Sequence, residues 1–282
     1  MCVVTGANRG IGKATTIALA RLGATLVMLA RDERLLTAAR DDVVRESGNS
    51  HVSIVVADLA SFAAIRSAAA EIATRHPALH VLVHNAGVNP SRRLLSSDGI
   101  ELAFAVNHLA PFLLTHELMS SLRRGAADGG ARVVTVASMF ERFGRLSLSD
   151  VRTTGRGMAI LAYTRSKLAN VLFTYELAER LAGTGVTANC VDPGLVATDL
   201  MREHALFRPR WLRAVWSRVL RTPEAGAGAA IYAASAAELV GVTGQCFDGQ
   251  GRRVRTSHRS RDVELRRRLW KVSAELTGVG LG

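Results

Sequence analysis

The sequence predicts an α/β fold, a doubly wound and mostly parallel sheet of about seven strands with helices on both faces. Short, strand-like apolar runs alternate with longer stretches of helical periodicity over the 282 residues. The first of these runs leads into a glycine-rich turn that opens a helix. No repeat, linker or change in composition divides the chain, so we expect one domain over residues 1–282.

The chain begins with a short apolar strand, residues 1–4, which runs into the glycine-rich turn at 5–12 and a helix over 11–22. Glycines let the backbone approach a pyrophosphate, and the N–H groups and dipole of a helix N-terminus favour its charge. We therefore expect a dinucleotide here, with an ordinary strand-to-helix turn as the alternative. We also expect first-strand residues upstream of Met1. The candidate cofactor-binding residues are Gly6, Asn8, Arg9, Gly10, Ile11 and Gly12.

The second strand, residues 24–29, is followed by Ala30, Arg31 and Asp32. An acidic residue at this strand end usually binds the ribose 2′-hydroxyl of NAD, whereas an arginine accommodates the 2′-phosphate of NADP. Because Arg31 and Arg9 can both reach such a phosphate, we expect NADP(H). Asp32 argues in the other direction, and the alternative is that Arg31 only opens a solvated helix over 32–46.

Two more strands end in residues suited to a ligand. The third strand, residues 51–57, ends at Asp58, whose carboxylate is placed to accept a hydrogen bond from an adenine amino group. A helix over 62–75 and a strand over 79–84 lead into a tight turn of small residues at 85–87, beside which a ribose or flat ring can lie. The expected cofactor residues here are Asp58, Leu59, Asn85, Ala86 and Gly87.

Polar residues also occupy the predicted substrate side. Asn107 lies among apolar residues of a helix predicted over 99–122, and a satisfied structural amide is one reading of it. The fifth strand, residues 132–137, ends at Ser138. We expect a serine there to point into the cleft where a substrate oxygen would sit, although many strands end in Ser.

Apolar spacing predicts one long helix over 160–181. It places Tyr163 and Lys167 one turn apart on the same face. A neighbouring cation favours the phenolate and lowers a tyrosine pKa from its usual value of about 10. The pair then forms a general acid and base for an alcohol or a carbonyl, with an ordinary exposed helix pair as the alternative.

Together these motifs resemble the short-chain dehydrogenase/reductase family over nearly the whole chain. The segments 107–115, 166–173 and 269–276, with the long spacer between Ser138 and Tyr163, resemble its retinol-dehydrogenase-like branch. The family motifs, in chain order, are Thr5-Gly6-x-x-x-Gly10-x-Gly12, Asp58, Asn85-Ala86-Gly87, Asn107, Ser138, Tyr163-x-x-x-Lys167 and Pro193-Gly194.

The resemblance implies a Rossmann-type fold and a role for each residue. Tyr163 would exchange the proton with the substrate oxygen, and Ser138 would hydrogen-bond that oxygen. Lys167 would bind the nicotinamide ribose and lower the pKa of Tyr163, and Tyr163 would itself be a cofactor-binding residue. Asn107 would hold a water in a proton relay. The loop after the strand over 185–191 would cover the nicotinamide. Its expected cofactor residues are Pro193, Gly194, Val196 and Thr198, the last near the carboxamide.

The segment 201–221 mixes apolar and basic residues in an amphipathic stretch. We expect a substrate lid over about 195–221. Peripheral membrane contact and plain surface packing are the alternatives. A lid or a membrane contact implies a hydrophobic substrate. The remaining predicted elements are a helix over 223–237 that Pro223 opens, a strand over 244–247, an Arg-rich solvated turn over 249–261 and a helix over 262–276.

Composition limits the function classes. The formal net charge is +12, from 36 Lys and Arg against 24 Asp and Glu. No helix-turn-helix, zinc finger or aromatic single-strand platform accompanies this charge, so we expect no nucleic-acid partner. Cys2, Cys190 and Cys246 are scattered and odd in number, which argues against a disulfide framework or a metal site. No apolar run approaches the length of a membrane span and the start lacks a secretory-signal pattern, so we expect a cytoplasmic protein.

The sequence therefore predicts reversible hydride transfer between NADP(H) and a carbonyl/alcohol pair on a hydrophobic small molecule, with reduction favoured. Retinoid-like aldehydes, steroid ketones and polyketide-type ketones of secondary metabolism all remain open as substrates. The alternatives are an NAD-linked alcohol dehydrogenase and a non-catalytic Rossmann-type redox sensor. The resemblance also suggests a homo-oligomer through the helices that begin near Ile160 and Pro223.

Overall fold

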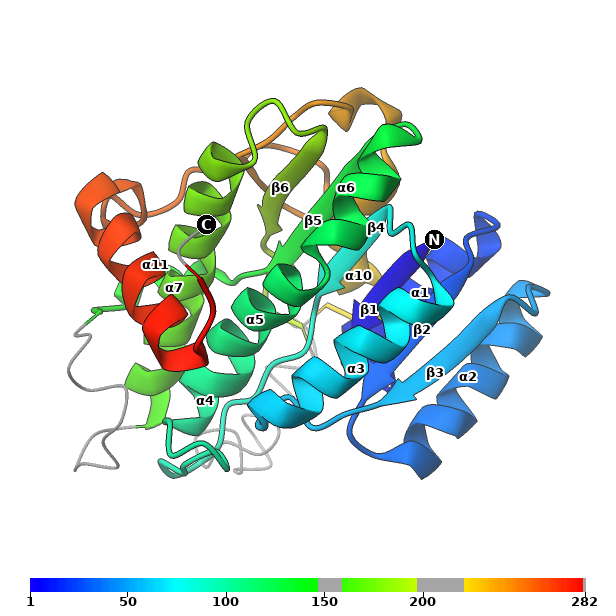
Figure 1. The fold of residues 1–282 in the computed structure, drawn as a ribbon, viewed down its shortest axis with the longest axis horizontal. Helices are drawn as coiled ribbons and strands as arrows, with labels where there is room; N and C mark the ends of the chain where they lie inside the picture. Colours follow the sequence, from blue (N-terminus) through cyan, green and yellow to red (C-terminus); the bar gives the residue numbers. More distant parts are fainter. Residues whose placement is uncertain (147–158, 197–220, 281–282) are drawn as a thin grey trace.

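A parallel sheet forms the centre of the computed structural model, which describes residues 1–146, 159–196 and 221–280 (Figure 1). Its seven strands lie in the order β3-β2-β1-β4-β5-β6-β7, and every neighbouring pair is parallel. The predicted doubly wound sheet is confirmed. The strands are β1 Cys2–Thr5, β2 Leu26–Ala30, β3 Val52–Val56, β4 Val81–His84, β5 Ala131–Val136, β6 Val186–Val191 and β7 Cys246–Phe247.

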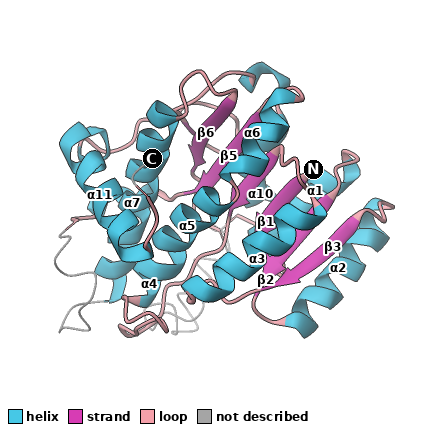
Figure 2. Cartoon of the chain, in the orientation of Figure 1, coloured by secondary structure: helices cyan, strands magenta, loops and turns pink. Residues whose placement is uncertain are grey.

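Helices cover both faces of the sheet (Figure 2). They are α1 Gly10–Arg21, α2 Glu33–Ser47, α3 Phe62–Arg75, α4 Leu102–Phe104, α5 Ala110–Glu117, α6 Met119–Ala127, α7 Ala159–Arg180, α10 Pro223–Ser235 and α11 Val263–Thr277. Short helical turns are η1 Ala105–Leu109, which is π-helical, and the 3-10 turns η2 Met139–Phe143, η5 Ala237–Leu239 and η6 Arg259–Arg261. Asp32, Ser61, Thr222 and Asp262 cap α2, α3, α10 and α11 by accepting a hydrogen bond from the N–H three residues on.

The two faces of the sheet have separate apolar cores because successive strand residues point to opposite sides. Val3 belongs to the core under α3, α5 and α7, whereas Val4 belongs to the core under α1, α2 and α10. α11 packs on the outer side of α7, where Trp270 stacks on Phe173 with ring centroids 6.1 Å apart. α7 is therefore covered by the sheet on one side and by α11 on the other.

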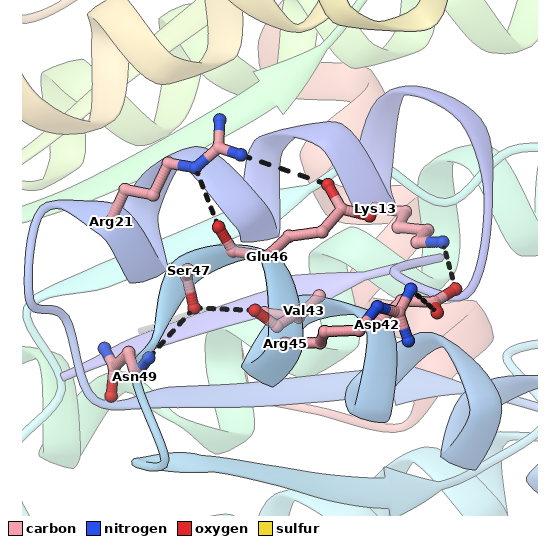
Figure 3. A network of polar contacts seen from close by, with 8 residues as sticks. All are labelled: Lys13, Arg21, Asp42, Val43, Arg45, Glu46, Ser47 and Asn49. Carbon is pink, nitrogen blue, oxygen red and sulfur yellow. Dashed lines mark hydrogen bonds and ion pairs between the residues drawn. The ribbon is translucent and has the colours of Figure 1, made fainter.

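Polar contacts fix the helix that follows the glycine turn (Figure 3). Lys13 of α1 forms an ion pair with Asp42 of α2 at 2.5 Å, and Asp42 also pairs with Arg45. Asn49 donates from Nδ2 to the carbonyl oxygens of Ala20 and Ala24, at 3.0 and 2.9 Å. These contacts connect both ends of α1 to α2 and the loop that follows it.

The segment predicted to be helical over 99–122 is helical from residue 102, but it is not one regular helix. The chain instead forms α4, the π-helical η1, α5 and α6 in succession. Pro111 explains the break, since it has no N–H to donate to the carbonyl of Asn107 four residues earlier. A π-helical turn inside a helix is rare and often marks a functional site.

The Arg-rich run over 249–261 is more than a solvated turn. Ser260 is fully buried, and Ser257 donates to Glu141 from both its N–H and its hydroxyl, at 2.7 and 2.6 Å. Within the described ranges, no helix is long and apolar enough to cross a bilayer, and no three His, Cys, Asp or Glu side chains gather as a metal site would require.

Candidate active site

The turn between β1 and α1 depends on its glycines. Gly6 and Gly10 have φ angles of +64° and +54°, a conformation that glycine adopts without steric cost. A Cβ on Gly12 would lie 2.2 Å from the carbonyl oxygen of Gly6. Arg9 precedes the first turn of α1, which contains no acidic residue. The glycines therefore set the backbone of a turn that ends at a helix N-terminus, where phosphate groups commonly bind.

The end of β4 is tied to this turn by hydrogen bonds. Thr5 Oγ1 accepts from the N–H groups of Asn85 and Ala86, at 3.0 and 3.1 Å. Asn85 donates from Nδ2 to the carbonyl oxygens of Thr5 and Gly6, at 2.9 and 3.3 Å. The side chain of Asn85 thus holds the glycine turn in position. The Asn-Ala-Gly motif alone did not indicate this structural role. Its predicted contact with the cofactor stays a prediction.

Charged residues line the ends of β2 and β3. Arg31 directly follows β2 and is exposed, as is Arg9. Asp32 accepts a hydrogen bond from the N–H of Leu35 at 2.9 Å, so this carboxylate caps α2. Asp58 is exposed and accepts from the N–H of Ala60 at 3.0 Å, while Leu59 is buried. Asp32, the acidic residue that follows β2, is therefore engaged within the protein.

The catalytic candidates meet at the carboxyl ends of β4 and β5. Lys167 Nζ donates to the carbonyl oxygen of Val136 at 2.9 Å and lies 5.7 Å from the centre of the Tyr163 ring. Ser138 follows β5 and hydrogen-bonds Tyr163. A Cβ on Gly87 would lie 3.5 Å from Asn107 Oδ1 and 3.7 Å from Lys167 Nζ. The structure therefore brings the four predicted residues and the turn after β4 together.

Burial determines the protonation of the catalytic pair. It raises the pKa of Tyr163 to about 12; the charge of Asp192 acts in the same direction and the hydrogen bond with Ser138 opposes it. Burial also lowers the pKa of Lys167 to about 8, against the attraction of Asp192. Burial of the phenol therefore outweighs the effects that lower this pKa, and the expectation that Lys167 lowers the pKa of Tyr163 stays a prediction. At neutral pH Tyr163 is a protonated phenol.

Asn107 lies in the π-helical turn η1 and is fully buried. Its Oδ1 accepts from the N–H of Val88 at 2.7 Å, and its Nδ2 donates to the Val88 carbonyl oxygen at 3.0 Å and to Ser166 Oγ at 2.9 Å. Both ends of the amide are satisfied within the protein, which agrees with the structural reading of this residue. Its predicted part in a water relay stays a prediction.

The loop after β6 returns toward the glycine turn. Gly194 has a φ of +74°, and its N–H donates to Asp192 Oδ1 at 2.9 Å. A Cβ on Gly226 of α10 would meet Val196 at 2.5 Å and Ile11 at 3.3 Å, so these two predicted cofactor residues lie near one another. Pro193 stands between Asp192 and Gly194. Thr198 and most of the lid predicted over about 195–221, namely residues 197–220, lie outside the described residues.

Residues 1–208 match the short chain dehydrogenase family. The chain belongs to the short-chain dehydrogenase/reductase family. Members of this family use NAD(P)(H), and the similarity to retinol dehydrogenases makes this chain an alcohol/carbonyl oxidoreductase. The cradle at Gly6, Gly10 and Gly12 fits such a dinucleotide, because side chains there would meet backbone atoms or strain the turn.

The similarity extends over almost the whole chain. Human retinol dehydrogenase 13 is 38% identical over 282 residues, covering 98% of this chain and 84% of that protein. Bovine dehydrogenase/reductase SDR family member 13 is 40% identical, over 99% of this chain and 74% of its own length. A crystal structure of a Mycobacterium paratuberculosis protein matches with 32% identity and a TM-score of 0.80, covering 100% of this chain and 94% of that one. This short-chain dehydrogenase/reductase is thus similar to the retinol-dehydrogenase branch.

Sequence reasoning missed two contacts that support the site of this short-chain dehydrogenase/reductase. Ser166 Oγ donates to the Tyr163 carbonyl oxygen at 2.8 Å while it accepts from Asn107, so it joins the π turn to α7. Glu101 is fully buried, caps α4 and pairs with Arg165 of α7 at 3.6 Å. Ser166 lies between Tyr163 and Lys167 in the sequence, which was a usable signal. The capping role of Glu101 was missed, because the predicted helix over 99–122 ran through this residue instead of beginning after it.

Proposed function

We propose that this short-chain dehydrogenase/reductase is an NADP(H)-dependent reductase of a hydrophobic ketone or aldehyde. The observation that carries the proposal is the buried Tyr163, whose pKa of about 12 keeps it a proton donor at neutral pH, next to Ser138. A carbonyl oxygen that receives a hydride on its carbon needs such a donor.

The cofactor would occupy the cradle between β1 and α1. Bound NADPH supplies the hydride. The glycine turn would hold the pyrophosphate, and Asp58 with Leu59 would hold the adenine, while the turn at 85–87 would lie beside the nicotinamide half. Lys167 would donate to the nicotinamide ribose from Nζ, which already lies close to Gly87. The glycine turn, Asp58 and the turn at 85–87 each follow a strand, at the edge where open sheets bind ligands.

Arg31 supports the choice of NADP(H) over NAD(H). It is exposed directly after β2, while the neighbouring Asp32 already accepts a hydrogen bond as the cap of α2. A guanidinium binds a phosphate bidentately. A structural neighbour described as an NAD(P)-dependent gluconate 5-dehydrogenase, from Beutenbergia cavernae, holds NADP at low occupancy; it is 31% identical with a TM-score of 0.69, over 89% of this chain and 94% of its own.

The proton transfer uses residues that the fold already brings together. Ser138 would hydrogen-bond the substrate oxygen, and Tyr163 would give that oxygen its proton. The phenolate that remains would be stabilised by the Lys167 ammonium, since opposite charges favour one another in a buried site. Ser166 and Asn107 would hold the backbone of Tyr163 in place during the transfer.

Apolar side chains near Tyr163 support a hydrophobic substrate. Phe140 packs edge-on against Tyr163 with ring centroids 6.2 Å apart, and Met139, Phe143 and Leu161 are exposed nearby in the sequence. The similarity to retinol dehydrogenases makes retinoid-like aldehydes one candidate class, and polyketide-type ketones are the other that we propose. A cytoplasmic location, a lid over about 195–221 and a homo-oligomer are further parts of the proposal.

A cofactor and substrate screen tests the proposal. Purified protein is assayed for oxidation of NADPH and of NADH with a panel of bulky ketones and aldehydes that includes retinaldehyde. We expect turnover with NADPH, and in Arg31→Ala a KM for NADPH that is about tenfold higher or more, since one charge-assisted contact is lost. Arg34→Ala, a change at a neighbouring exposed arginine, serves as the control. A preference for NADH in the wild type would overturn the assignment of Arg31, and tight NADPH binding without turnover would favour a redox sensor.

A further inference from the structure

Two segments far apart in the sequence form one surface beside the active site. η2 and the residues after it, 139–146, lie against the Arg-rich run 252–261. Arg142 Nη2 donates to the Arg255 carbonyl oxygen at 2.6 Å, and Arg259 Nη1 donates to the Gly144 carbonyl oxygen at 3.3 Å. Glu141 accepts from both donors of Ser257 between these two contacts. We call the joined segments the arginine surface.

The arginine surface is strongly positive. Its one carboxylate, Glu141, is 3% exposed and is engaged by Ser257, and the next acidic residue along the chain, Asp262, caps α11. Arg252 pairs with Asp248 at 2.7 Å. The other arginines are exposed and, among the described residues, have no carboxylate partner. They are Arg142, Arg145, Arg253, Arg255, Arg259 and Arg261.

Apolar side chains project from the same surface. Phe143 is 66% exposed and Met139 is 44% exposed, and Phe143 stands between Arg142 and Arg145 in the sequence. The rings of Phe143 and Phe140 are 6.4 Å apart, and Phe140 is in edge contact with Tyr163. The rings of Tyr163, Phe140 and Phe143 therefore form a continuous row from the catalytic phenol to the arginine surface.

We propose that the arginine surface docks on an anionic phospholipid bilayer. Exposed aromatic and methionine side chains enter the acyl boundary, while surrounding arginines bind lipid phosphates. An acidic protein or a nucleic acid complements the charge equally well, but neither accounts for an exposed Phe143 that continues inward to Tyr163. Docking would bring the mouth of the site to the membrane, where hydrophobic substrates partition. Only this last step rests on the proposed function.

Vesicle co-sedimentation of the full chain tests the docking without turnover. Phosphatidylcholine vesicles are compared with vesicles in which about a third of the lipid is phosphatidylglycerol, at low and physiological salt. We expect binding to the anionic vesicles alone, and weaker binding at higher salt. Arg253→Glu with Arg255→Glu should weaken it by about tenfold or more, and Phe143→Ser by severalfold.

The matched control is Arg34→Glu with Arg123→Glu, which makes the same change of net charge at exposed arginines outside the arginine surface. Circular dichroism of each variant checks that the fold is retained. Equal binding losses in both double variants, no binding of the wild type to anionic vesicles, or binding only to an acidic polymer would overturn the proposal. Because sedimentation needs neither cofactor nor substrate, failure of docking leaves the proposed reductase untouched, and failure of the reductase leaves docking untouched.

Discussion

The glycine turn after β1 and the catalytic face of α7 meet at one edge of the sheet, yet the chain holds them by different means. The turn is set by backbone conformation, with Gly6 and Gly10 at positive φ and Gly12 in contact with Gly6. The catalytic face is set by buried polar side chains, such as Ser166, which reach it from several elements. We expect cofactor binding at the glycine turn to be sensitive to substitutions that add atoms. We expect activity at the catalytic face to be sensitive to the loss of a hydrogen bond or of a proton.

The largest effect should come from removing the proton donor of the catalytic face. Tyr163→Phe keeps the buried ring but has no proton to give, so we expect kcat for carbonyl reduction to fall by about 100- to 10,000-fold. The Kd for NADPH should change little, because the glycine turn is untouched. Steady-state kinetics and fluorescence titration of NADPH measure the two quantities.

Tyr175→Phe is the matched control for this change. Tyr175 lies on the same helix, and its hydroxyl hydrogen-bonds Thr256 at 2.9 Å rather than any residue of the site. The control should retain kcat. A Tyr163→Phe enzyme with normal kcat would remove the proposed acid from the mechanism.

The next largest effect should come from adding one carbon to the glycine turn. Gly12→Ala would place a Cβ 2.2 Å from the Gly6 carbonyl oxygen, so the turn must open. Such overpacking costs about 1–3 kcal/mol, and if the turn bears this cost when NADPH binds, the Kd for NADPH should be about five- to 150-fold higher. Titration of NADPH fluorescence measures the Kd.

Gly23→Ala separates crowding from backbone strain. Gly23 has a φ of +79°, but a Cβ there would meet nothing within 4 Å. It should lower the free energy of unfolding without changing the Kd for NADPH. Equal losses of cofactor affinity in both variants would show that the close approach at Gly12 does not matter.

These two regions also differ in how far the sequence could predict them. The glycine turn and the Tyr163–Lys167 pair could be predicted because each lies within a few neighbouring residues. The bonds from Asn107 to Val88 and Ser166 could not, since they depend on packing between distant segments. Pro111 was a usable signal for the interruption of the helix, because proline has no N–H to donate to the carbonyl of Asn107 four residues earlier. The raised pKa of Tyr163 depends on burial, which helical spacing alone does not give.

A pH profile sharpens the comparison further. The pKa of Lys167 is about 8 in the folded protein and about 10.4 for an unfolded lysine, so its ammonium is lost as pH rises through 8. Reductase activity should then fall by up to about tenfold per pH unit above 8, while Tyr163 stays protonated. Stability should respond in the opposite direction. Between the two pKa values the unfolded chain binds more protons, so this group increases the free energy of unfolding with pH.

Kinetics and urea unfolding at a series of pH values separate these two trends. In Lys167→Arg the guanidinium keeps its charge, so activity should be lower throughout but should not fall near pH 8. An unchanged fall in that variant, or a loss of stability that parallels the loss of activity, would assign the pH effect to another group.

The smallest effect should come from the two hydrogen bonds of Ser166, one of which joins the π turn to α7. Ser166→Ala removes an acceptor for Asn107 and a donor to the Tyr163 carbonyl oxygen, a loss of about 1 kcal/mol that should lower kcat by about threefold to tenfold. The KM for NADPH should stay the same. Thr174→Val is the control, since Thr174 is equally buried on α7 and donates only to Asn170, at 2.8 Å. If both variants lower kcat alike, Ser166 contributes to the stability of α7 rather than to the position of Tyr163.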